Sequence, residues 1–472
     1  MKPVAIIGGG ITGLTAAFYL KARHIPVLLF EASPRLGGVI QSVRCDGYLA
    51  EFGPNSILET SPLLSGLVRE LGLESRRMYS DPAAEKRYVV RNNKPVEIPS
   101  SPVGFLTTPL FSLPAKLRVL AEPFIARASE GMEESIAQFV QRRLGQEFLD
   151  YAIDPLVAGI YAGNPEQLSV TQAFPKLAAL EQRYRSLFLG QFLGARERKR
   201  RGEVSKQNAK KFSFDEGLQV LIDALRARLE EEIETSAPIR SLRRTEQGWL
   251  VETEGNTSFG RVECNAVVLA LPAHRMAALD IQTTPALDVS PLAKVYYPPV
   301  ASVVLGFRRA DVAHPLDGFG MLVPKKEGFN ILGALFSSSL FPNRAPKGEV
   351  AITCYLGGAR QPLLALNPEQ ILAQIARKDL ETILGVRGQP TFQNVAVYRQ
   401  AIPQYNLGFG KVRELMNKME TQAPGLFVAG HARDGISLSD SIVSGHRAAE
   451  KIAGYLSANQ SHAESMQPAL CA

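Results

Sequence analysis

The chain has 472 residues, of which 45% are hydrophobic and 21% are charged, so it is long enough for about two or three globular domains. Its four cysteines, Cys45, Cys264, Cys354 and Cys471, form no C-x-x-C pair, which argues against a disulfide framework and predicts no metal site. The formal net charge is +7, and the chain has no run of about eighteen apolar residues that would predict a membrane-spanning helix.

The first predicted element is a β-α-β unit with a glycine fingerprint. Val4–Ile7 predicts a buried strand, and Val27–Phe30 predicts a second strand that ends at Glu31. The glycines between them allow a tight turn close to a pyrophosphate, and the following helix points its N-terminus at the phosphates. Glu31 is placed to accept hydrogen bonds from a ribose. The predicted contacts in the turn are Gly8, Gly9, Gly10, Ile11, Thr12 and Gly13.

Strands and helices alternate along the rest of the chain. Lys86–Ile98 predicts a hairpin that turns at Asn92-Asn93, and residues 114–194 have a helical pattern. The later predicted elements are a helix over Leu218–Leu229, strands within 236–272, a strand-rich segment over Val295–Tyr355, a helix over Glu369–Leu384, a strand over Leu426–Gly430 and a helix over Asp440–Leu456. We expect the strands near residues 4, 27, 267 and 427 to form one sheet, so the nucleotide domain is discontinuous.

Two segments indicate contact with a surface. Ser100–Ala115 holds no charge and is broken by Pro102, Pro109 and Pro114, so it either dips into one membrane leaflet or is buried as a loop with short helices. Arg183–Lys211 holds ten Lys or Arg and two Asp or Glu, an excess above the net charge of the whole chain. This excess of positive charge favours contact with an anionic membrane or an acidic substrate. Alternatively, the segment is a solvated basic linker. Nucleic acid is not expected, because aromatic residues are not interleaved.

Three further motifs resemble the FAD signature of the amine oxidase and desaturase superfamily. They are the glycine pair Gly37-Gly38, the loop Glu51–Ser56 and the closing motif Ala429–Ser441, in which a helix N-terminus would face the flavin carbonyl. Arg35 would add positive charge near the phosphates. In addition to Glu31 and the first glycine turn, the resemblance implies FAD contacts at Ala32, Arg35, Gly37, Gly38, Val39, Gly53, Pro54, Asn55, Ser56, Ile239, His431, Ile436, Ser437 and Leu438.

A narrower resemblance, to the protoporphyrinogen oxidase family of heme biosynthesis, covers essentially the whole chain. It is carried by Lys86–Asn92, Phe139–Gly145, Ala158–Pro165, Leu168-Ser169, Gly318–Pro324, Leu335–Ser338, Gly357-Gly358 and Ile402–Tyr405. The resemblance implies an α/β fold with three parts. These are a discontinuous Rossmann-like FAD domain (1–85, 213–275 and 405–460), an inserted α+β substrate domain (86–99 and 276–404) and a helical membrane-associated domain (100–212), followed by a flexible tail (461–472).

The same resemblance implies the substrate contacts. Arg87 matches an arginine that pairs with a substrate propionate, Leu322 and Leu335 match residues that sandwich a pyrrole ring, and Tyr355 stands where an aromatic residue stacks. The implied reaction is oxidation of protoporphyrinogen IX to protoporphyrin IX by three hydride transfers to the flavin N5, each followed by reoxidation with O2 to give H2O2. It requires no strong protein base, so we assign no catalytic side chain and interpret His431 as a backbone contact.

Other functions remain open at this stage. Coproporphyrinogen III is an alternative substrate, and Arg91, Lys94, Arg183 and Arg185 supply additional positive charge for its four propionates. An amine oxidase would need an aromatic cage, which Tyr405 and Phe409 could mimic, but Tyr398–Asp440 contains no cysteine that could bind the flavin covalently. A carotenoid desaturase and a non-catalytic FAD-binding assembly protein are further alternatives.

The predicted partners follow from this reaction. They are the porphyrinogen, O2, an anionic membrane surface, ferrochelatase as the acceptor of the product, and a second copy of the chain in a homodimer. Met1-Lys2 leads directly into a strand without a charged leader, so we expect no export. The expected location is the cytoplasm, peripheral on the inner face of the cell membrane.

Overall fold

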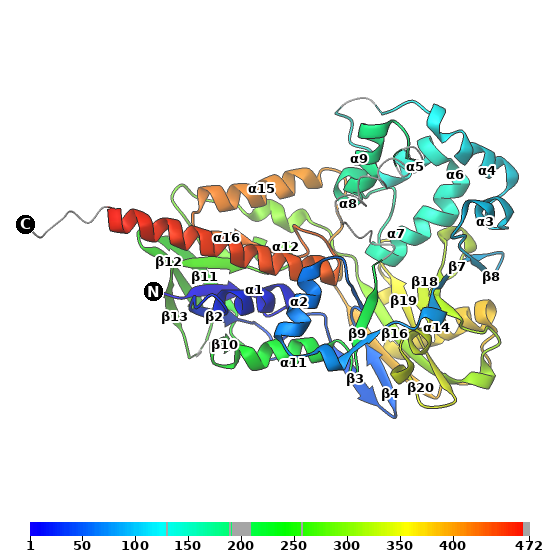
Figure 1. Cartoon of the computed structure of the whole chain (residues 1–472), viewed down its shortest axis with the longest axis horizontal. Coiled ribbons are helices and arrows are strands. Elements are labelled where there is room, and N and C mark those ends of the chain that lie inside the picture. The colour runs from blue at the N-terminus through cyan, green and yellow to red at the C-terminus, as the bar shows by residue number, and fades with distance from the viewer. Residues whose placement is uncertain (129–130, 188–189, 191–208, 256–257, 466–472) are drawn as a thin grey trace, which may run out of the picture.

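A five-stranded parallel sheet forms the nucleotide-binding part of the computed structural model, which describes residues 1–128, 131–187, 190, 209–255 and 258–465 (Figure 1). In order across the sheet, the strands are β10 (Ile233–Glu234), β2 (Val27–Phe30), β1 (Val4–Ile7), β14 (Ala266–Leu269) and β21 (Leu426–Val428). Every residue of β1 and β14 is buried, because both faces of the sheet are covered. The predicted single sheet built from distant segments is confirmed.

The two faces of this sheet pack against different layers. Ile6 of β1 packs with Leu14 and Ile452 on the helical side, where α1 and α16 lie side by side (Figure 1). Its neighbour Ile7 packs with Val251 in a second sheet on the opposite side. The helices are α1 (Ile11–Lys21), α2 (Pro62–Glu70), α11 (Gln219–Arg228) and α16 (Leu438–Ser465). The opposite layer contains β13 (Arg261–Cys264), β12 (Gly248–Thr253), β11 (Ile239–Thr245), β15 (Asp280–Gln282), α12 (Ala273–Ala277) and α15 (Phe409–Gln422).

A separate seven-stranded sheet forms the second large β layer. Its order is β20 (Phe392–Tyr398), β16 (Val300–Arg308), β19 (Glu349–Gly357), β18 (Ile331–Leu335), β17 (Gly318–Leu322), β7 (Lys86–Arg91) and β8 (Lys94–Glu97). The predicted hairpin is confirmed as β7–β8, and β7 joins the sheet by pairing in parallel with β17. The helix α14 (Glu369–Leu384) has the predicted bounds and packs Leu372 and Leu380 against Val303 and Cys354 on one face.

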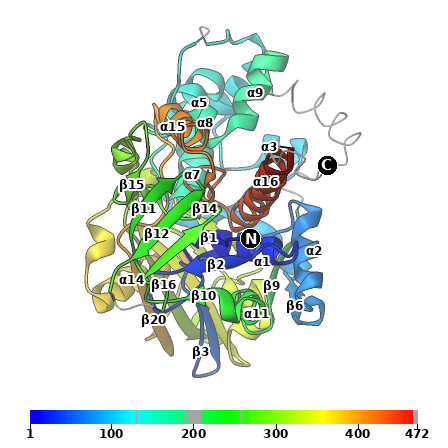
Figure 2. The same cartoon turned by 90° about the vertical axis from the view of Figure 1, so that its left-hand side faces the viewer.

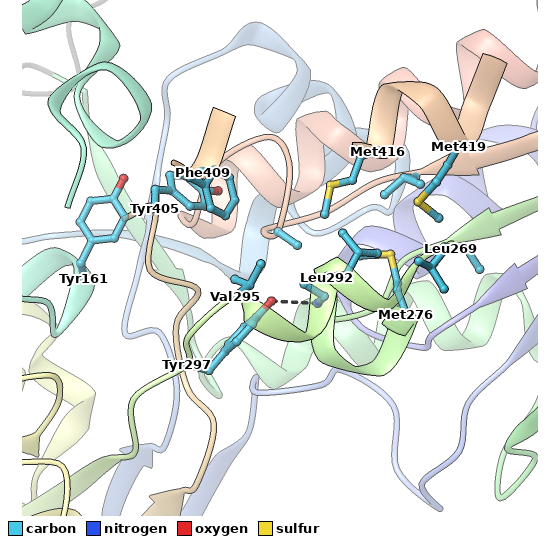
Figure 3. Close-up of a cluster of buried hydrophobic side chains, with 14 of the residues drawn as sticks. Tyr161, Leu269, Met276, Leu292, Val295, Tyr297, Tyr405, Phe409, Met416 and Met419 are labelled. Carbon is cyan, nitrogen blue, oxygen red and sulfur yellow. Dashed lines mark hydrogen bonds between the residues drawn. The ribbon is translucent and has the colours of Figure 1, made fainter. Parts of the chain in front are cut away.

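The region between β8 and β9 is helical. Its elements are α3 (Pro102–Thr107), α4 (Leu113–Leu120), α5 (Ile136–Leu144), α6 (Gln146–Phe148), a π-helical turn (Leu149–Ile153), α7 (Asp154–Tyr161), α8 (Val170–Ala173) and α9 (Pro175–Tyr184). In both views α5, α8 and α9 lie toward the top of the picture and β3 lies at the bottom (Figures 1 and 2). One apolar cluster runs from Leu269 of β14 to Tyr161 of α7, whose ring centroid lies 5.9 Å from that of Tyr405 (Figure 3).

Short strands connect these layers. β3 (Ser42–Cys45) pairs with β4 (Tyr48–Glu51), while β9 (Lys211–Phe214) pairs with both β5 (Ile57–Leu58) and β6 (Arg77–Tyr79). A short helix, α13 (Ser337–Leu340), follows β18. On the face of the seven-stranded sheet that α14 leaves free, Tyr48 of β4 packs against Val304 of β16. This face therefore meets the segment that leads out of the nucleotide-binding part.

The C-terminal end differs from the sequence prediction. Helix α16 continues to Ser465, so the tail predicted from residue 461 is helical at its start. The reason is that no glycine or proline interrupts Tyr455–Ser465, which leaves nothing to end the helix. Residues 466–472 and most of the basic run at 183–211 lie outside the described residues. Within the described residues, no helix is long and apolar enough to cross a membrane. The domain boundaries and the membrane association remain predictions.

Candidate functional site: a cofactor edge facing a substrate sheet

Predicted contacts follow strands of the parallel sheet. Gly8 comes directly after β1 and Glu31 directly after β2, while Gly430, in the closing motif, comes two residues after the end of β21. The carboxyl ends of parallel strands meet at the same edge of a sheet, so these residues converge there. The order of the strands also reverses at β1, between β2 and β14, which is where ligands bind in sheets of this kind.

The first glycine turn has the shape that a diphosphate requires. A Cβ at Gly13 would lie 1.9 Å from the carbonyl oxygen of Gly8, so α1 can approach the sheet only with glycine here. A Cβ at Gly10 would meet no atom within 4 Å. Gly10 is the N-cap of α1 and supplies no side-chain cap, so the amides of the first turn, including those of Ile11 and Thr12, are left for an anion.

Glu31, which was predicted to accept hydrogen bonds from a ribose, also holds the glycine turn. Its carboxylate accepts hydrogen bonds from the backbone N–H of Gly9 at 2.7 Å and of Ser33 at 2.8 Å. Its backbone carbonyl accepts from the N–H of Ala237 at 2.9 Å. That bond brings Ile239, the predicted contact of the adenine, beside the end of β2 and the following Ala32.

The glycine pair Gly37-Gly38 lies against the first glycine turn. The N–H of Gly37 donates to the carbonyl of Gly9 at 2.8 Å, and Gly37 and Gly38 have φ values of 96° and 60°, which favour glycine. Arg35 was predicted to bring positive charge to the phosphates. Its guanidinium donates to the carbonyls of Leu36, Gly38 and Ile40, so it also holds the shape of this loop.

The closing motif joins α16 to α1. The Thr12 hydroxyl donates to the carbonyl of Ser441 at 3.2 Å, and the N–H of Gly430 donates to the hydroxyl of Ser444 at 2.8 Å. Ser437 caps the helix, because its hydroxyl accepts from the N–H of Asp440 at 3.1 Å. The N-termini of both helices therefore converge beside Ile436 and Leu438, and two such termini favour bound negative charge.

His431 lies in this motif as a neutral side chain. The Tyr405 hydroxyl donates to the His431 carbonyl, which fixes this part of the backbone. Burial, with a smaller contribution from His274, lowers the pKa of the His431 imidazole to about 4. Its Nε2 is buried without a hydrogen-bond partner among the described residues. A buried polar atom of this kind is suited to meet a bound group.

The loop Glu51–Ser56 links the edge of the parallel sheet, where the predicted cofactor contacts lie, to the seven-stranded sheet. A Cβ at Gly53 would lie 2.1 Å from the carbonyl oxygen of Val39, so this loop packs directly on the second glycine loop. After Pro54, the amide of Asn55 donates to the Tyr355 hydroxyl at 2.6 Å. Burial raises the pKa of Tyr355, so its phenol stays protonated.

The residues predicted to bind the substrate are Arg87, Leu322, Leu335 and Tyr355. Leu322 and Tyr355 both lie opposite Gly333 in the ladder of the seven-stranded sheet. Leu335 and Arg87 both lie opposite Gly320. These two rows are separated by two residues along each strand, so all four side chains project from one face. It is the face opposite α14, and the sheet therefore brings the predicted set together.

A buried ion pair supports the same junction and was missed by sequence reasoning. Arg344 donates to the Glu51 carboxylate at 3.3 Å and to the Ser213 hydroxyl at 2.7 Å, and both charged side chains are about 2% exposed. Burial raises the pKa of Glu51 to about 7, with Arg344 acting in the opposite direction. No local pattern around Arg344 indicates this contact, because its partners lie far away in the chain.

Comparisons with known proteins agree with this arrangement. The profile of the family described as flavin containing amine oxidoreductase matches residues 11–453. The chain is 34% identical to protoporphyrinogen oxidase 2 of Arabidopsis thaliana, over 96% of this chain and 94% of that protein. It is 30% identical to coproporphyrinogen III oxidase of Bacillus subtilis, over 96% and 98%. The crystal structure of an Exiguobacterium protein assigned to the protoporphyrinogen oxidases superposes with a TM-score of 0.79 at 25% identity, covering 97% and 99%.

Two glycine loops and two converging helix N-termini at the edge of a parallel sheet agree with the family match, and together they identify a flavin-dependent oxidoreductase. The chain belongs to the flavin containing amine oxidoreductase family, within the protoporphyrinogen oxidase group. The predictions of the family, of an enzyme and of FAD as its cofactor are confirmed, as is the mixed α/β fold with a parallel sheet. The roles of the individual site residues remain predictions.

Proposed function

We propose that this chain oxidises a porphyrinogen to the porphyrin, with FAD as electron acceptor and O2 as the final oxidant. The observation that carries the proposal is the common face of Arg87, Leu322, Leu335 and Tyr355, which the Asn55–Tyr355 hydrogen bond joins to the cofactor loop. FAD, when bound, accepts a hydride from a carbon atom of the substrate. The role of the protein's own side chains is to bind the macrocycle and to orient it over this face.

The side chains at the site suit this passive role. Leu322 and Leu335 offer apolar surface to pyrrole rings, and Tyr355 offers an aromatic face. The guanidinium of Arg87 is exposed and can receive a propionate through two parallel hydrogen bonds. Tyr355 and His431 are both neutral at neutral pH, so neither adds a charge beside the reacting ring.

Protoporphyrinogen IX, with two propionates, is the substrate that the charges favour. Arg91, one of the extra cations that could serve coproporphyrinogen III, is already paired with Glu147 at 2.7 Å and donates to the carbonyl of Leu110. Its charge is therefore offset within the protein. Coproporphyrinogen III, with four propionates, remains the alternative substrate, and the ratio of kcat/KM for the two compounds decides between them.

An anaerobic assay tests the function. Addition of protoporphyrinogen to the FAD-loaded protein should bleach the flavin absorbance, and O2 should restore it together with porphyrin fluorescence. Arg87→Ala should raise KM by about tenfold or more while FAD stays bound, because a charged hydrogen bond to the substrate is lost. Lys86→Met, on the adjacent residue that pairs with Asp317 at 2.6 Å, serves as the control. A flavin that stays oxidised with both porphyrinogens would refute the proposal.

We also infer that the surface of α3 and α4 rests on a membrane. Val103 of α3 and Leu113, Leu117 and Leu120 of α4 are 54–71% exposed, and the nearby Phe124 is 89% exposed. The two cations on α4 do not offset this apolar surface. Lys116 donates to the carbonyls of Leu106 and Thr108 at 2.8 Å, and Arg118 donates to the carbonyls of Arg142 and Arg143. A group of exposed apolar side chains on short neighbouring helices favours a lipid interface.

A peripheral position on the inner face of the cell membrane fits this surface and places the enzyme in the cytoplasm. It would shorten the path of an apolar product to the next enzyme, for which ferrochelatase is the candidate. No spanning helix is needed for such a position, because apolar side chains inserted to the level of the head groups are sufficient to hold a protein.

A further inference from the structure

Lys211 occupies an unusual place at the start of β9. Its neighbours Phe212 and Phe214 are buried in the core of the nucleotide-binding part. Side chains alternate along a strand, so Lys211 and Ser213 project to the other side. Ser213 there accepts a hydrogen bond at 2.7 Å from Arg344, which lies in the segment between α13 and β19, so this side of β9 faces a segment that joins two elements of the seven-stranded sheet region.

The ammonium of Lys211 lies at that sheet beside Arg87. Its Nζ is 5.5 Å from the ring centroid of Phe319 on β17, and the next residue, Gly320, lies opposite Arg87 in the ladder. Burial lowers the pKa of Lys211, and the positive charge of Arg87 lowers it further, while Glu85 acts in the opposite direction. The two cations are therefore close enough to repel each other.

Neither cation is neutralised within the described part of the chain. The side chains of Lys211 and Arg87 make no ion pair or hydrogen bond with any described residue, and Lys211 is nevertheless half-buried. A half-buried ammonium next to a guanidinium is costly unless an anion joins them. The adjacent Lys210 differs, because it is exposed to solvent and its Nζ lies over the ring of Tyr79, at 5.3 Å, and not at β17.

We propose that Lys211 is a second carboxylate-binding residue of the substrate site, which takes the propionate next to the one held by Arg87. The inference rests on the proposed function. In protoporphyrinogen IX the two propionates are carried by neighbouring pyrrole rings, so they reach the protein side by side. Arg87 of β7 and Lys211 of β9 would each hold one propionate. Together they would determine which edge of the macrocycle faces the nucleotide-binding part.

Substitution of the two adjacent lysines separates this role from general charge effects. Lys211→Met should weaken binding of protoporphyrinogen and of the product protoporphyrin IX by about tenfold, with kcat little changed, because a hydrogen bond to a charged group is lost. Lys211→Arg should restore most of the affinity. Lys210→Met removes the same charge from the neighbouring position. It should leave both the binding affinity and kcat within about twofold of the wild type.

Esterified product provides a second readout that does not depend on turnover. Binding of protoporphyrin IX and of its dimethyl ester to the FAD-loaded proteins would be followed by quenching of porphyrin fluorescence. The wild type should prefer the diacid, and Lys211→Met should reduce that preference by about tenfold. The double variant Arg87→Ala/Lys211→Met should lose the preference almost completely, because each residue binds its own carboxylate.

The outcomes distinguish the inference from the function on which it rests. If the wild type oxidises protoporphyrinogen and Lys211→Met keeps the affinity and the preference for the diacid, the role of Lys211 is wrong and the function stands. The same conclusion follows if Lys210→Met and Lys211→Met weaken binding equally. If the FAD-loaded wild type neither binds nor oxidises a porphyrinogen, the proposed function itself fails.

Discussion

At the level of single residues, burial sets the charge of the site. His431 lies beside the cofactor edge and is neutral, because burial lowers the pKa of its imidazole to about 4. In the unfolded chain a histidine has a pKa of about 6.5, so between these values the unfolded state binds a proton that the folded state does not. The free energy of unfolding therefore rises with pH through this window and falls on acidification.

The consequence can be measured by replacing His431. We expect the wild type to lose about 1–3 kcal/mol of stability between pH 6.5 and pH 4 through this histidine, and His431→Gln to lose correspondingly less. Urea unfolding at several pH values, with FAD at the same saturation in each sample, provides the comparison. His24→Gln, at an exposed position, is the control. Parallel pH profiles for the wild type and His431→Gln would contradict the expectation.

Sequence patterns identified some of these residues and missed others. His431 was found because it lies inside an ordered motif, but its neighbour Tyr297, with ring centroids 5.9 Å apart, comes from a distant segment. Lys211 could have been found, because the alternation Lys211-Phe212-Ser213-Phe214 separates two polar from two aromatic side chains. That Lys211 lies beside Arg87 could not have been predicted, since β7 and β9 belong to different sheets.

At the level of elements, two glycines of the first turn have different tasks. Gly10 has a φ of −72° and open space around its Cβ direction, so alanine fits the protein itself. We expect Gly10→Ala to keep the melting temperature of the FAD-free protein while weakening FAD binding by about tenfold or more, because the methyl group would intrude where the backbone meets the diphosphate.

Gly13→Ala should act differently, because its Cβ would collide with the backbone of Gly8. It should lower both the melting temperature and FAD affinity. Gly454→Ala, at an exposed position within α16, should slightly stabilise the protein and leave FAD binding unchanged. Calorimetry of the FAD-free proteins and flavin fluorescence titration measure the two quantities. Equal FAD affinity in Gly10→Ala and wild type would argue against a diphosphate at this turn.

Local periodicity predicted the elements better than their pairing. The bounds of α14 and the strands β1, β2 and β14 follow from apolar patterns within each segment. The hairpin β7–β8 was also found locally, but its union with β17 depends on the pairing of Arg87 with Gly320, more than 200 positions away. Such registers depend on tertiary packing, which no short window of sequence contains.

At the level of the whole molecule, the surface of α3 and α4 leads to a test of membrane binding. The wild type should sediment with vesicles that contain anionic phospholipid. The triple variant Leu113→Gln, Leu117→Gln and Leu120→Gln should bind at least about tenfold more weakly, because each side chain contributes apolar area. Leu363→Gln, at a position that is 79% exposed outside this surface, is the control. Equal vesicle binding by the triple variant and wild type would rule out this surface.

The parallel sheet also determines when the enzyme can first take up its cofactor during synthesis. β1 and the glycine turn leave the ribosome early, but their neighbour β14 begins at residue 266, and β21 and α16 begin at residues 426 and 438. Chains fold as their segments emerge, and pairings between distant segments come late. A chain that stops before residue 426 thus carries the whole glycine fingerprint and lacks the second helix N-terminus. We therefore expect flavin uptake only after α16 has packed beside α1 at the parallel sheet.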